Sequence, residues 1–475
     1  MKQLQRSLLA VGLASLPSSC MMMGHDMDEM GVPPLIDIGS SSAPFEAATA
    51  ENTSTKSGKV TYELEARPAR IELADGRSAS MWTYNGSMPG PTLEAHIGDR
   101  IRVHLTNSLP VPTTVHWHGM RLPADMDGVP GPQTTIAPGA DFTYEFTALD
   151  AGTFWYHPHV SSDEQVERGL YGAIVVHDDN EPEATSEHVA VLDDVLLADD
   201  GELAGFSTSP MQAMVGRQGN VLLVNGHARP SLDMAPAGLH RFRFIAAATA
   251  RYFRLSLGGR AFQVIGFGNG KLEAPQKVTE LLLVPGARAD VLVEAPADSK
   301  LNWKTLSYDR GHGTGGGPVG HLFSATIAGD AADPVTMPDA FEAIQTLGAA
   351  NRVRTLRLGE NMMMHGGPTF SINGKAFPDG ETFTSSIGQI EDWKIVNDTT
   401  MDHPFHIHGF RFQVVAEGGR ATKPSSFFDT INVPAQETIT IRIPLEANPG
   451  LWMFHCHILE HAERGMMGTL DVSAR

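Results

Sequence analysis

The chain has 475 residues, which is too long for one ordinary domain and predicts two to four. It carries 55 acidic against 35 basic side chains, and this acidic balance excludes a nucleic-acid-binding function, which needs a basic surface. With 48 glycines, 31 prolines and 7% aromatic residues, the composition is typical of a folded, turn-rich protein.

The first 20 residues have the plan of a secretory signal. Two basic residues precede an apolar run from Leu8 to Leu16, which is too short to span a membrane, and small residues follow it. This pattern predicts export to the bacterial periplasm or cell envelope. Cys20 follows a stretch similar to a lipoprotein cleavage site, except that Pro17 stands where leucine is usual. A lipid anchor at Cys20 and loss of Cys20 with the signal are therefore both open.

Residues 21–54 are expected to form a flexible segment rich in methionine and histidine. Its first ten residues hold five methionines, one histidine and three carboxylates, and thioethers select Cu(I). Recruitment of copper is one interpretation of this composition, and a disordered tether with incidental methionines is the other. A second run, Met362 to Met364 before His365, is equally open between copper recruitment and packing in a core.

An internal repeat sets the number of domains. Asn-Gly pairs, which favour tight turns, occur at Asn85, Asn225 and Asn373, 140 and 148 residues apart. Each pair is followed roughly 20 residues later by a strand of alternating character, as a β-sandwich requires. These strands are Ile101 to Leu105, Phe242 to Ile245 and Trp393 to Val396. We predict three β-sandwich domains, at residues 55–180, 181–335 and 336–475.

Three groups of closely spaced histidines lie along the chain. Side chains two residues apart point to the same face of a strand, so each such pair can face one metal. A single pair means little in a chain with 20 histidines, but several pairs together indicate a metal cluster. The groups are His116 and His118; His157 and His159; and His403, His406 and His408.

A cysteine between two histidines lies near the C-terminal end, in the run His455-Cys456-His457, and His461 and Met466 follow. In a strand, the two flanking histidines share one face while Cys456 points to the other. Cys456 can therefore bind one metal while its neighbours bind others. A thiolate, two imidazoles and a weak axial thioether are the ligands of a blue copper site. One histidine from elsewhere completes that site, and eight of the ten histidines in these groups remain for further metal ions.

At these motifs the chain resembles the multicopper oxidases, a family that includes laccases and bacterial copper-efflux oxidases. The resemblance covers about residues 60–475, with all four copper motifs in family order. It implies an all-β fold of three consecutive cupredoxin-like Greek-key β-sandwich domains. It also implies four copper ions: one of type 1, one of type 2 and two of type 3. The implied ligands are His403, Cys456, His461 and Met466 for type 1; His116 and His406 for type 2; and His118, His157, His159, His408, His455 and His457 for type 3.

The resemblance implies that donors pass single electrons to the type 1 copper. Cys456 would conduct them to a trinuclear cluster between the first and third domains, where O2 is reduced to water. Two donor classes stay open: phenols or aromatic amines for a laccase-like enzyme, and Cu(I), or less readily Fe(II) or Mn(II), for an oxidase of periplasmic copper tolerance. The lack of a long methionine-rich insertion favours the first class, while the methionine clusters and Met401 favour the second. A monomer is expected. Relatives that have lost their copper ligands and serve non-enzymatic roles form a third class, which the complete ligand set disfavours.

Two acids are candidates for delivering protons. Asp127 matches an acidic residue that family members place near the type 2 copper, although an aspartate before a glycine is also a common turn residue. Bacterial copper-efflux oxidases carry a glutamate directly after the last type 1 histidine, but here that position is Ala462. Either Glu463 acts from the next position or another acid takes the role.

Overall fold

The computed structural model describes residues 32–206, 209–296, 299–313, 316–363, 367–446 and 448–474. The predicted secretory signal, Cys20, the methionine-rich run of residues 21–30, Met364 and His365 lie outside the described residues, as do the side chains of residues 362 and 363. Within the described part of the chain, strands predominate and form six sheets, which confirms the all-β prediction. No helix in that part has the length and apolar character needed to cross a membrane.

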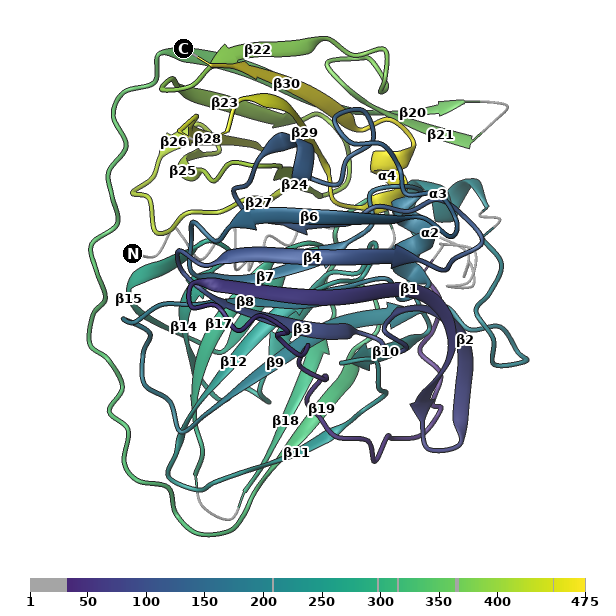
Figure 1. Cartoon of the computed structure of the whole chain (residues 1–475), viewed down its shortest axis with the longest axis vertical. Coiled ribbons are helices and arrows are strands. Elements are labelled where there is room, and N and C mark those ends of the chain that lie inside the picture. The colour runs from purple at the N-terminus through teal and green to yellow at the C-terminus, as the bar shows by residue number, and fades with distance from the viewer. Residues whose placement is uncertain are drawn as a thin grey trace, which may run out of the picture.

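The first sandwich contains two four-stranded sheets, with strand orders β2-β1-β4-β6 and β3-β8-β7-β5 (Figure 1). One turn of 3-10 helix, η2 (Ala124–Met126), and the short helix α2 (Ser162–Glu167) lie in its loops. The strands are β1 (Lys59–Ala74), β2 (Arg77–Tyr84), β3 (Gly90–His96), β4 (Arg100–Asn107), β5 (His116–His118), β6 (Asp141–Thr147), β7 (Gly152–His157) and β8 (Gly172–His177).

The second sandwich contains a six-stranded sheet of order β10-β9-β12-β17-β14-β15 and a five-stranded sheet of order β11-β19-β18-β13-β16. The helix α3 (Pro210–Val215) precedes β10. The strands are β9 (Ser186–Val195), β10 (Val221–Val224), β11 (Ser231–Met234), β12 (Leu239–Ala246), β13 (Phe253–Ser256), β14 (Phe262–Phe267), β15 (Gly270–Val278), β16 (Glu280–Leu283), β17 (Arg288–Glu294), β18 (Lys300–Leu306) and β19 (Gly320–Ile327).

The third sandwich also has six- and five-stranded sheets, with orders β21-β20-β23-β28-β25-β26 and β22-β30-β29-β24-β27. The helix α4 (Leu459–Glu463) lies between its last two strands. The strands are β20 (Arg352–Met363), β21 (Gly367–Ile372), β22 (Thr382–Ser386), β23 (Ile390–Asn397), β24 (His403–Ile407), β25 (Gln413–Glu417), β26 (Arg420–Ala421), β27 (Thr430–Val433), β28 (Thr438–Pro444), β29 (Gly450–Cys456) and β30 (Met467–Ser473).

The same local structure underlies all three copies of the sequence repeat. Asn85, Asn225 and Asn373 have φ values of 56°, 51° and 55°, and the glycine after each also has a positive φ, as a tight Asn-Gly turn requires. Each asparagine side chain accepts a hydrogen bond from the first strand of its domain. That first strand pairs in parallel with the strand predicted downstream of the turn: β1 with β4, β9 with β12 and β20 with β23.

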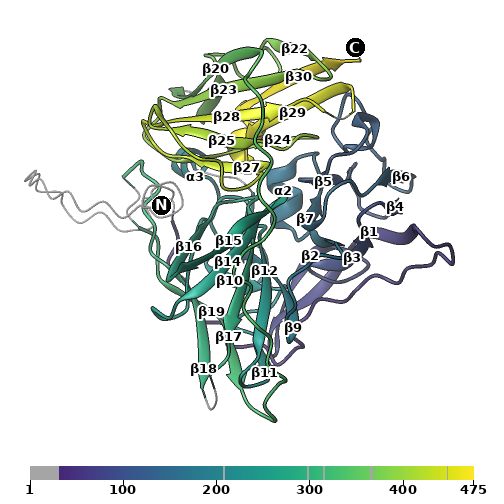
Figure 2. The ribbon, with the colours of Figure 1, turned by 90° about the vertical axis from the view of Figure 1, so that its left-hand side faces the viewer.

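The packing of the domains brings two separate parts of the chain together. The second and third domains share one continuous hydrophobic core, in which the Phe267 and Phe428 rings lie 5.6 Å apart. An extended segment, residues 328–351, runs along the outside of the molecule from the second domain to the third (Figure 1). Figure 2 shows β24 and β29 of the third domain directly beside β5 and β7 of the first. The histidine motifs lie on these four strands and on the residues that directly follow β7, β24 and β29.

Candidate metal centres

Strand pairing places the predicted histidines next to one another within each domain. In the first domain β5 and β7 run antiparallel, with His116 opposite His157. In the third domain β24 and β29 run antiparallel, with His406 opposite His455. Every position of β5 and β24 is buried, so both pairs face the interior.

Histidines of the first and third domains then meet across the domain boundary. The ring of His116 stacks on that of His408, and the ring of His118 stacks on that of His406, with centroids 3.8 Å apart in both pairs. The first and third domains therefore form one histidine group together. One buried group contains His116, His118, His157, His159, His406, His408, His455 and His457, whose ring lies 4.9 Å from that of His118.

The hydrogen bonds of these histidines leave a free nitrogen on each of several rings. The Nδ1–H groups of His116, His157 and His406 donate to main-chain carbonyls at 2.9 to 3.0 Å. Their Nε2 atoms are buried and have no hydrogen-bond partner among the described residues, and the same holds for both nitrogens of His457. Burying a polar atom without a partner is costly, whereas a metal-binding histidine uses one nitrogen for an outer hydrogen bond and the other for the metal. The group therefore fits metal ions.

Three of the histidines converge on a single point. The Nε2 atom of His455 lies 3.1 Å from Nε2 of His408 and 3.4 Å from Nε2 of His159. His408 and His455 use their other nitrogens to donate, to Asp127 and to the carbonyl of Cys456. Three imidazole nitrogens that lie this close together, two of them on rings that donate through their other nitrogen, form a ready metal site.

Burial also keeps these imidazoles in the neutral form that binds metal. Desolvation lowers the pKa of His159 to about 3 and holds the pKa values of His408, His455 and His457 well below the usual histidine value. Since protons compete with a metal only below the pKa of its ligands, bound copper should resist mild acid.

We expect the site formed by His159, His408 and His455 to keep its copper at pH 5.5, where an ordinary histidine with a pKa of 6.5 is mostly protonated. Loss should begin only as the pH falls toward about 3, the pKa of His159 in the folded chain. Copper content after dialysis against a chelator at pH 7, 5.5 and 3.5 measures this. Release between pH 7 and 5.5 would contradict it.

A second buried group contains the thiol. The Sγ atom of Cys456 lies 3.5 Å from Nδ1 of His403 and 3.7 Å from Nδ1 of His461, and the two nitrogens are 3.3 Å apart. A point equidistant from the three atoms lies about 2 Å from each, close to a metal–imidazole bond length. The opposite nitrogens are held by Thr399 Oγ1 at 2.9 Å and by the carbonyl of Met214 at 3.0 Å. The three atoms can therefore surround one ion.

Other residues secure the walls of this second group. The Phe370 ring stacks on His461 with centroids 3.9 Å apart, and Met214 belongs to α3 of the second domain. The main chain of fully buried Met466 is hydrogen-bonded to both Cys456 and His461, which keeps the residue beside the thiol. Burial raises the pKa of the Cys456 thiol, so a bound metal must displace its proton. The axial role of Met466 stays a prediction.

The two proton-delivery candidates have very different surroundings. Asp127 is buried between the first and third domains, where its Oδ2 accepts a bond of 2.7 Å from His408 Nδ1 and its Oδ1 lies 3.2 Å from His116 Nδ1. Burial raises the pKa of Asp127. Glu463 is exposed, and its Oε1 accepts bonds from the main chain and hydroxyl of Ser162. This position does not favour Glu463 as the substitute acid.

Glu460 is a buried acid that the sequence analysis did not single out. Its Oε1 accepts a bond from the Arg217 amide at 2.6 Å, while Oε2 is buried without a partner among the described residues. Burial raises the pKa of Glu460 to about 8. Sequence reasoning also missed Asp429 and Arg288, whose ion pair lies beside His118 and His406. Neither residue belongs to a histidine motif, so no local signal marks them.

Comparisons with known proteins agree with this geometry. Family models described as multicopper oxidase match residues 65–181, 184–314 and 350–475. The multicopper oxidase MmcO of Mycobacterium tuberculosis is 31% identical over 510 residues, which cover 98% of this chain and 96% of the relative. The solved structure of a Campylobacter jejuni multicopper oxidase, described as a metallo-oxidase, is similar to this chain with a TM-score of 0.82 at 30% identity. The similarity covers 94% of this chain and 97% of the Campylobacter jejuni chain. CueO of Ochrobactrum sp., described as laccase-like with activity towards lignin model compounds and lignosulfonate, is similar with a TM-score of 0.81 at 26% identity, covering 90% and 100%.

Proposed function

The chain belongs to the multicopper oxidase family, and from that premise we propose that it is a laccase, which oxidises phenolic or aromatic donors. It is a copper-dependent oxidoreductase with O2 as its electron acceptor. The observation that carries the proposal is the convergence of ten histidines and Cys456 into two buried groups, in the larger of which several ring nitrogens have no hydrogen-bond partner among the described residues.

We assign the two groups different tasks. His403, Cys456, His461 and Met466 would hold the type 1 copper, and the eight-histidine group would hold the type 2 and type 3 ions. The type 2 ligands are His116 and His406, and the type 3 ligands are His118, His157, His159, His408, His455 and His457. Copper supplies one-electron redox chemistry, and four such ions match the four electrons that O2 needs to form two waters.

The protein's own residues connect and isolate these groups. Cys456 is covalently joined to His455 and His457, and His455 donates to the Cys456 carbonyl at 2.8 Å, so the two groups share one short stretch of backbone. Burial of the eight histidines would exclude bulk solvent from metal ions bound among them. Asp127, which accepts from His408, is placed to hold or pass a proton.

Oxidation of Cu(I) is the second candidate function. Met401 is fully buried two residues before His403, and its main-chain carbonyl accepts from Thr399, whose hydroxyl also bonds the His403 ring. A methionine therefore belongs to the surroundings of the type 1 group. The similar Campylobacter jejuni protein is described as a metallo-oxidase. The laccase proposal keeps priority because the sequence lacks a long methionine-rich insertion beside the type 1 motifs.

Oxygen uptake by the copper-loaded protein distinguishes the two donor classes. With a simple phenol such as 2,6-dimethoxyphenol and no added copper, we expect rapid uptake. Stabilised Cu(I) is the competing donor, and Cys456→Ser is the blank. Uptake mainly with Cu(I), or phenol turnover only in excess copper, would replace the laccase proposal by the cuprous oxidase.

We also propose that the protein acts in the periplasm or cell envelope as a monomer. The location rests on the secretory pattern of residues 1–20, and a lipid anchor at Cys20 is one form of it. The mass of the mature N-terminal peptide from a bacterial host tests this. A diacylated Cys20 supports the anchor, whereas an unprocessed Met1 would contradict export.

A further inference from the structure

The second domain supplies none of the proposed copper ligands, but one of its turns reaches the histidine group. This turn joins β16 to β17, and Gly286 in it has a φ of +80°. A side-chain carbon at Gly286 would lie 2.8 to 2.9 Å from atoms of the His457 ring, closer than real contacts of that kind. Glycine is therefore what lets this backbone approach His457 so closely.

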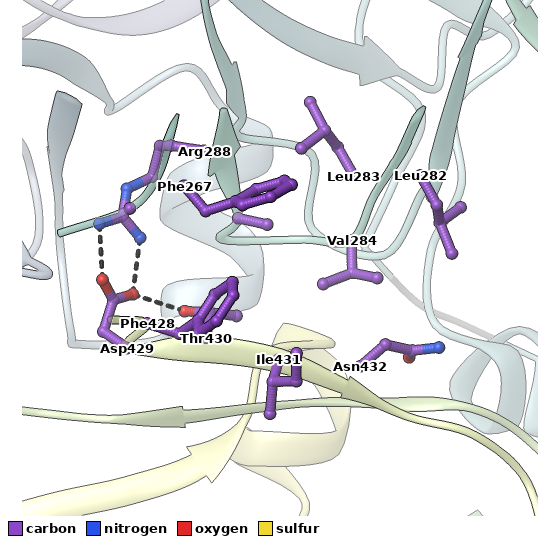
Figure 3. Close-up of a pocket in the computed structure, with 12 residues that line it drawn as sticks. Phe267, Leu282, Leu283, Val284, Arg288, Phe428, Asp429, Thr430, Ile431 and Asn432 are labelled. Carbon is purple, nitrogen blue, oxygen red and sulfur yellow. Dashed lines mark hydrogen bonds and ion pairs between the residues drawn. The ribbon is translucent and has the colours of Figure 1, made fainter. Parts of the chain in front are cut away.

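Arg288, the first residue of β17, joins all three domains. Its two terminal nitrogens donate to the two carboxylate oxygens of Asp429 in the third domain, both at 2.6 Å (Figure 3). Its Nε donates to the carbonyl of Thr153 in the first domain at 3.0 Å, and its Nη1 donates to the carbonyl of Gly286 at 3.1 Å. A planar guanidinium with two parallel bonds fixes the orientation of the carboxylate that it holds.

Asp429 passes this constraint to two of the proposed copper ligands. Its Oδ1 accepts from His118 Nε2 at 3.1 Å and from Thr430 Oγ1 at 2.8 Å. Its main-chain carbonyl accepts from His406 Nδ1 at 2.9 Å. The opposite nitrogens, Nδ1 of His118 and Nε2 of His406, are buried and have no hydrogen-bond partner among the described residues. Both rings are therefore anchored on the Asp429 side and free on the other.

The surroundings of the ion pair strengthen it. The Arg288 and Asp429 side chains are 1% and 0% exposed. Figure 3 shows Phe267, Val284 and Phe428 lining the apolar pocket beside them. In such a low-dielectric environment a paired charge binds its partner strongly, and a charge without a partner is costly.

We propose that Arg288 is a positioning residue of the trinuclear copper site, which acts through Asp429 to orient one type 2 ligand, His406, and one type 3 ligand, His118. The inference rests on the ligand roles proposed above for these two histidines. Arg288 brings the second domain into the site without touching metal. Loss of its fork leaves the Asp429 carboxylate without its bidentate partner, so His118 loses a fixed hydrogen-bond acceptor. His406 is affected through the Asp429 main-chain carbonyl that it bonds and through the carboxylate oxygen 3.5 Å from its Nδ1.

The test compares two conservative variants of the full-length, copper-loaded protein. Arg288→Lys keeps the positive charge but removes the bidentate fork. Arg251→Lys is the matched control, because Arg251 is also buried in the second domain and pairs with buried Asp194 at 2.5 Å. Paramagnetic resonance of the type 2 copper and copper per chain are measured, with the visible absorption of the type 1 copper as an internal reference for folding.

For Arg288→Lys we expect type 2 copper affinity to fall by about 10–100-fold, the usual effect of losing an outer-shell partner, while the type 1 absorption is retained. Arg251→Lys should keep both signals. Asp429→Asn, which preserves shape but removes the charge, should repeat the selective loss.

An unchanged type 2 spectrum and copper content in Arg288→Lys would overturn the proposal. Loss of both copper types together, or an equal loss in Arg251→Lys, would overturn it as well, because either result indicates general destabilisation rather than positioning. Phenol oxidation is not a readout of this comparison. A wild-type protein that binds four coppers but oxidises no phenol would refute the laccase proposal alone.

Discussion

Cys456→Ser should abolish the visible type 1 absorption and the oxidation of every donor together. A serine hydroxyl cannot replace the soft thiolate that faces His403 and His461, so the site loses the ligand that selects copper and joins it to the adjacent histidines. Replacing a residue that only hydrogen-bonds to a metal ligand typically lowers activity by about 10–100-fold. Turnover in Cys456→Ser should fall by more than that. Steady-state oxygen uptake with a phenol and with Cu(I) measures the loss.

The type 2 copper serves as the control within the same variant. Because His455 and His457 point away from the thiol, the type 2 resonance should persist in Cys456→Ser with three coppers per chain. Retained donor turnover in this variant would contradict the assignment of Cys456 as the link between the two groups.

Asp127→Asn should slow the reaction with O2 without slowing reduction of the type 1 copper. The Asp127 carboxylate accepts from His408 Nδ1 at 2.7 Å, and its other oxygen lies 3.2 Å from His116 Nδ1, which donates to the Asp127 main-chain carbonyl. Asparagine removes the negative charge and can place an NH2 group, which cannot accept, against one of these two rings. We expect kcat to fall by about 10–100-fold, as for other outer-shell partners of metal-bound histidines. Stopped-flow mixing, first with a donor under anaerobic conditions and then with O2, separates the two half-reactions.

Asp125→Asn is the matched control, since Asp125 is exposed only two positions away. It should leave both half-reactions unchanged. A slower reduction of the type 1 copper in Asp127→Asn, or an equal effect in Asp125→Asn, would show that Asp127 does not act at the eight-histidine group.

The histidine pairs could be grouped from sequence because their geometry is local. A strand has a side-chain period of two, so His116 and His118 must share a face wherever that strand packs, and His455 and His457 must lie opposite Cys456. The Asn-Gly turns were equally informative, since positive φ at Asn85, Asn225 and Asn373 is a property of the turn itself. The prediction of three β-sandwiches followed from these local periods, whereas the cupredoxin fold was implied by the family resemblance.

Contacts that depend on docking between domains could not be predicted in this way. Arg288 and Asp429 are 141 residues apart and meet only when the turn before β17 packs against the first and third domains. The stacking of Phe370 on His461 and the bond from His461 to Met214 have the same origin. Nothing in the spacing of these residues marks them.

The orientation of Glu460 and Glu463, the acids that follow the C-terminal copper motif, could not be predicted from sequence either. Helix α4 begins directly after the ligand strand, and its single turn directs Glu460 inward and Glu463 outward to Ser162. Counting positions from His461 could not reveal this rotation. Which acid accompanies Asp127 in proton delivery is a question for variants of both glutamates.

The ratio of donor oxidised to O2 consumed tests the central claim most directly. We predict that the copper-loaded protein oxidises four equivalents of a one-electron phenolic donor per O2 and releases no hydrogen peroxide. The reason is that the group of His403, Cys456 and His461 and the eight-histidine group work together as one four-electron unit. A ratio of two with accumulation of hydrogen peroxide would contradict this unit.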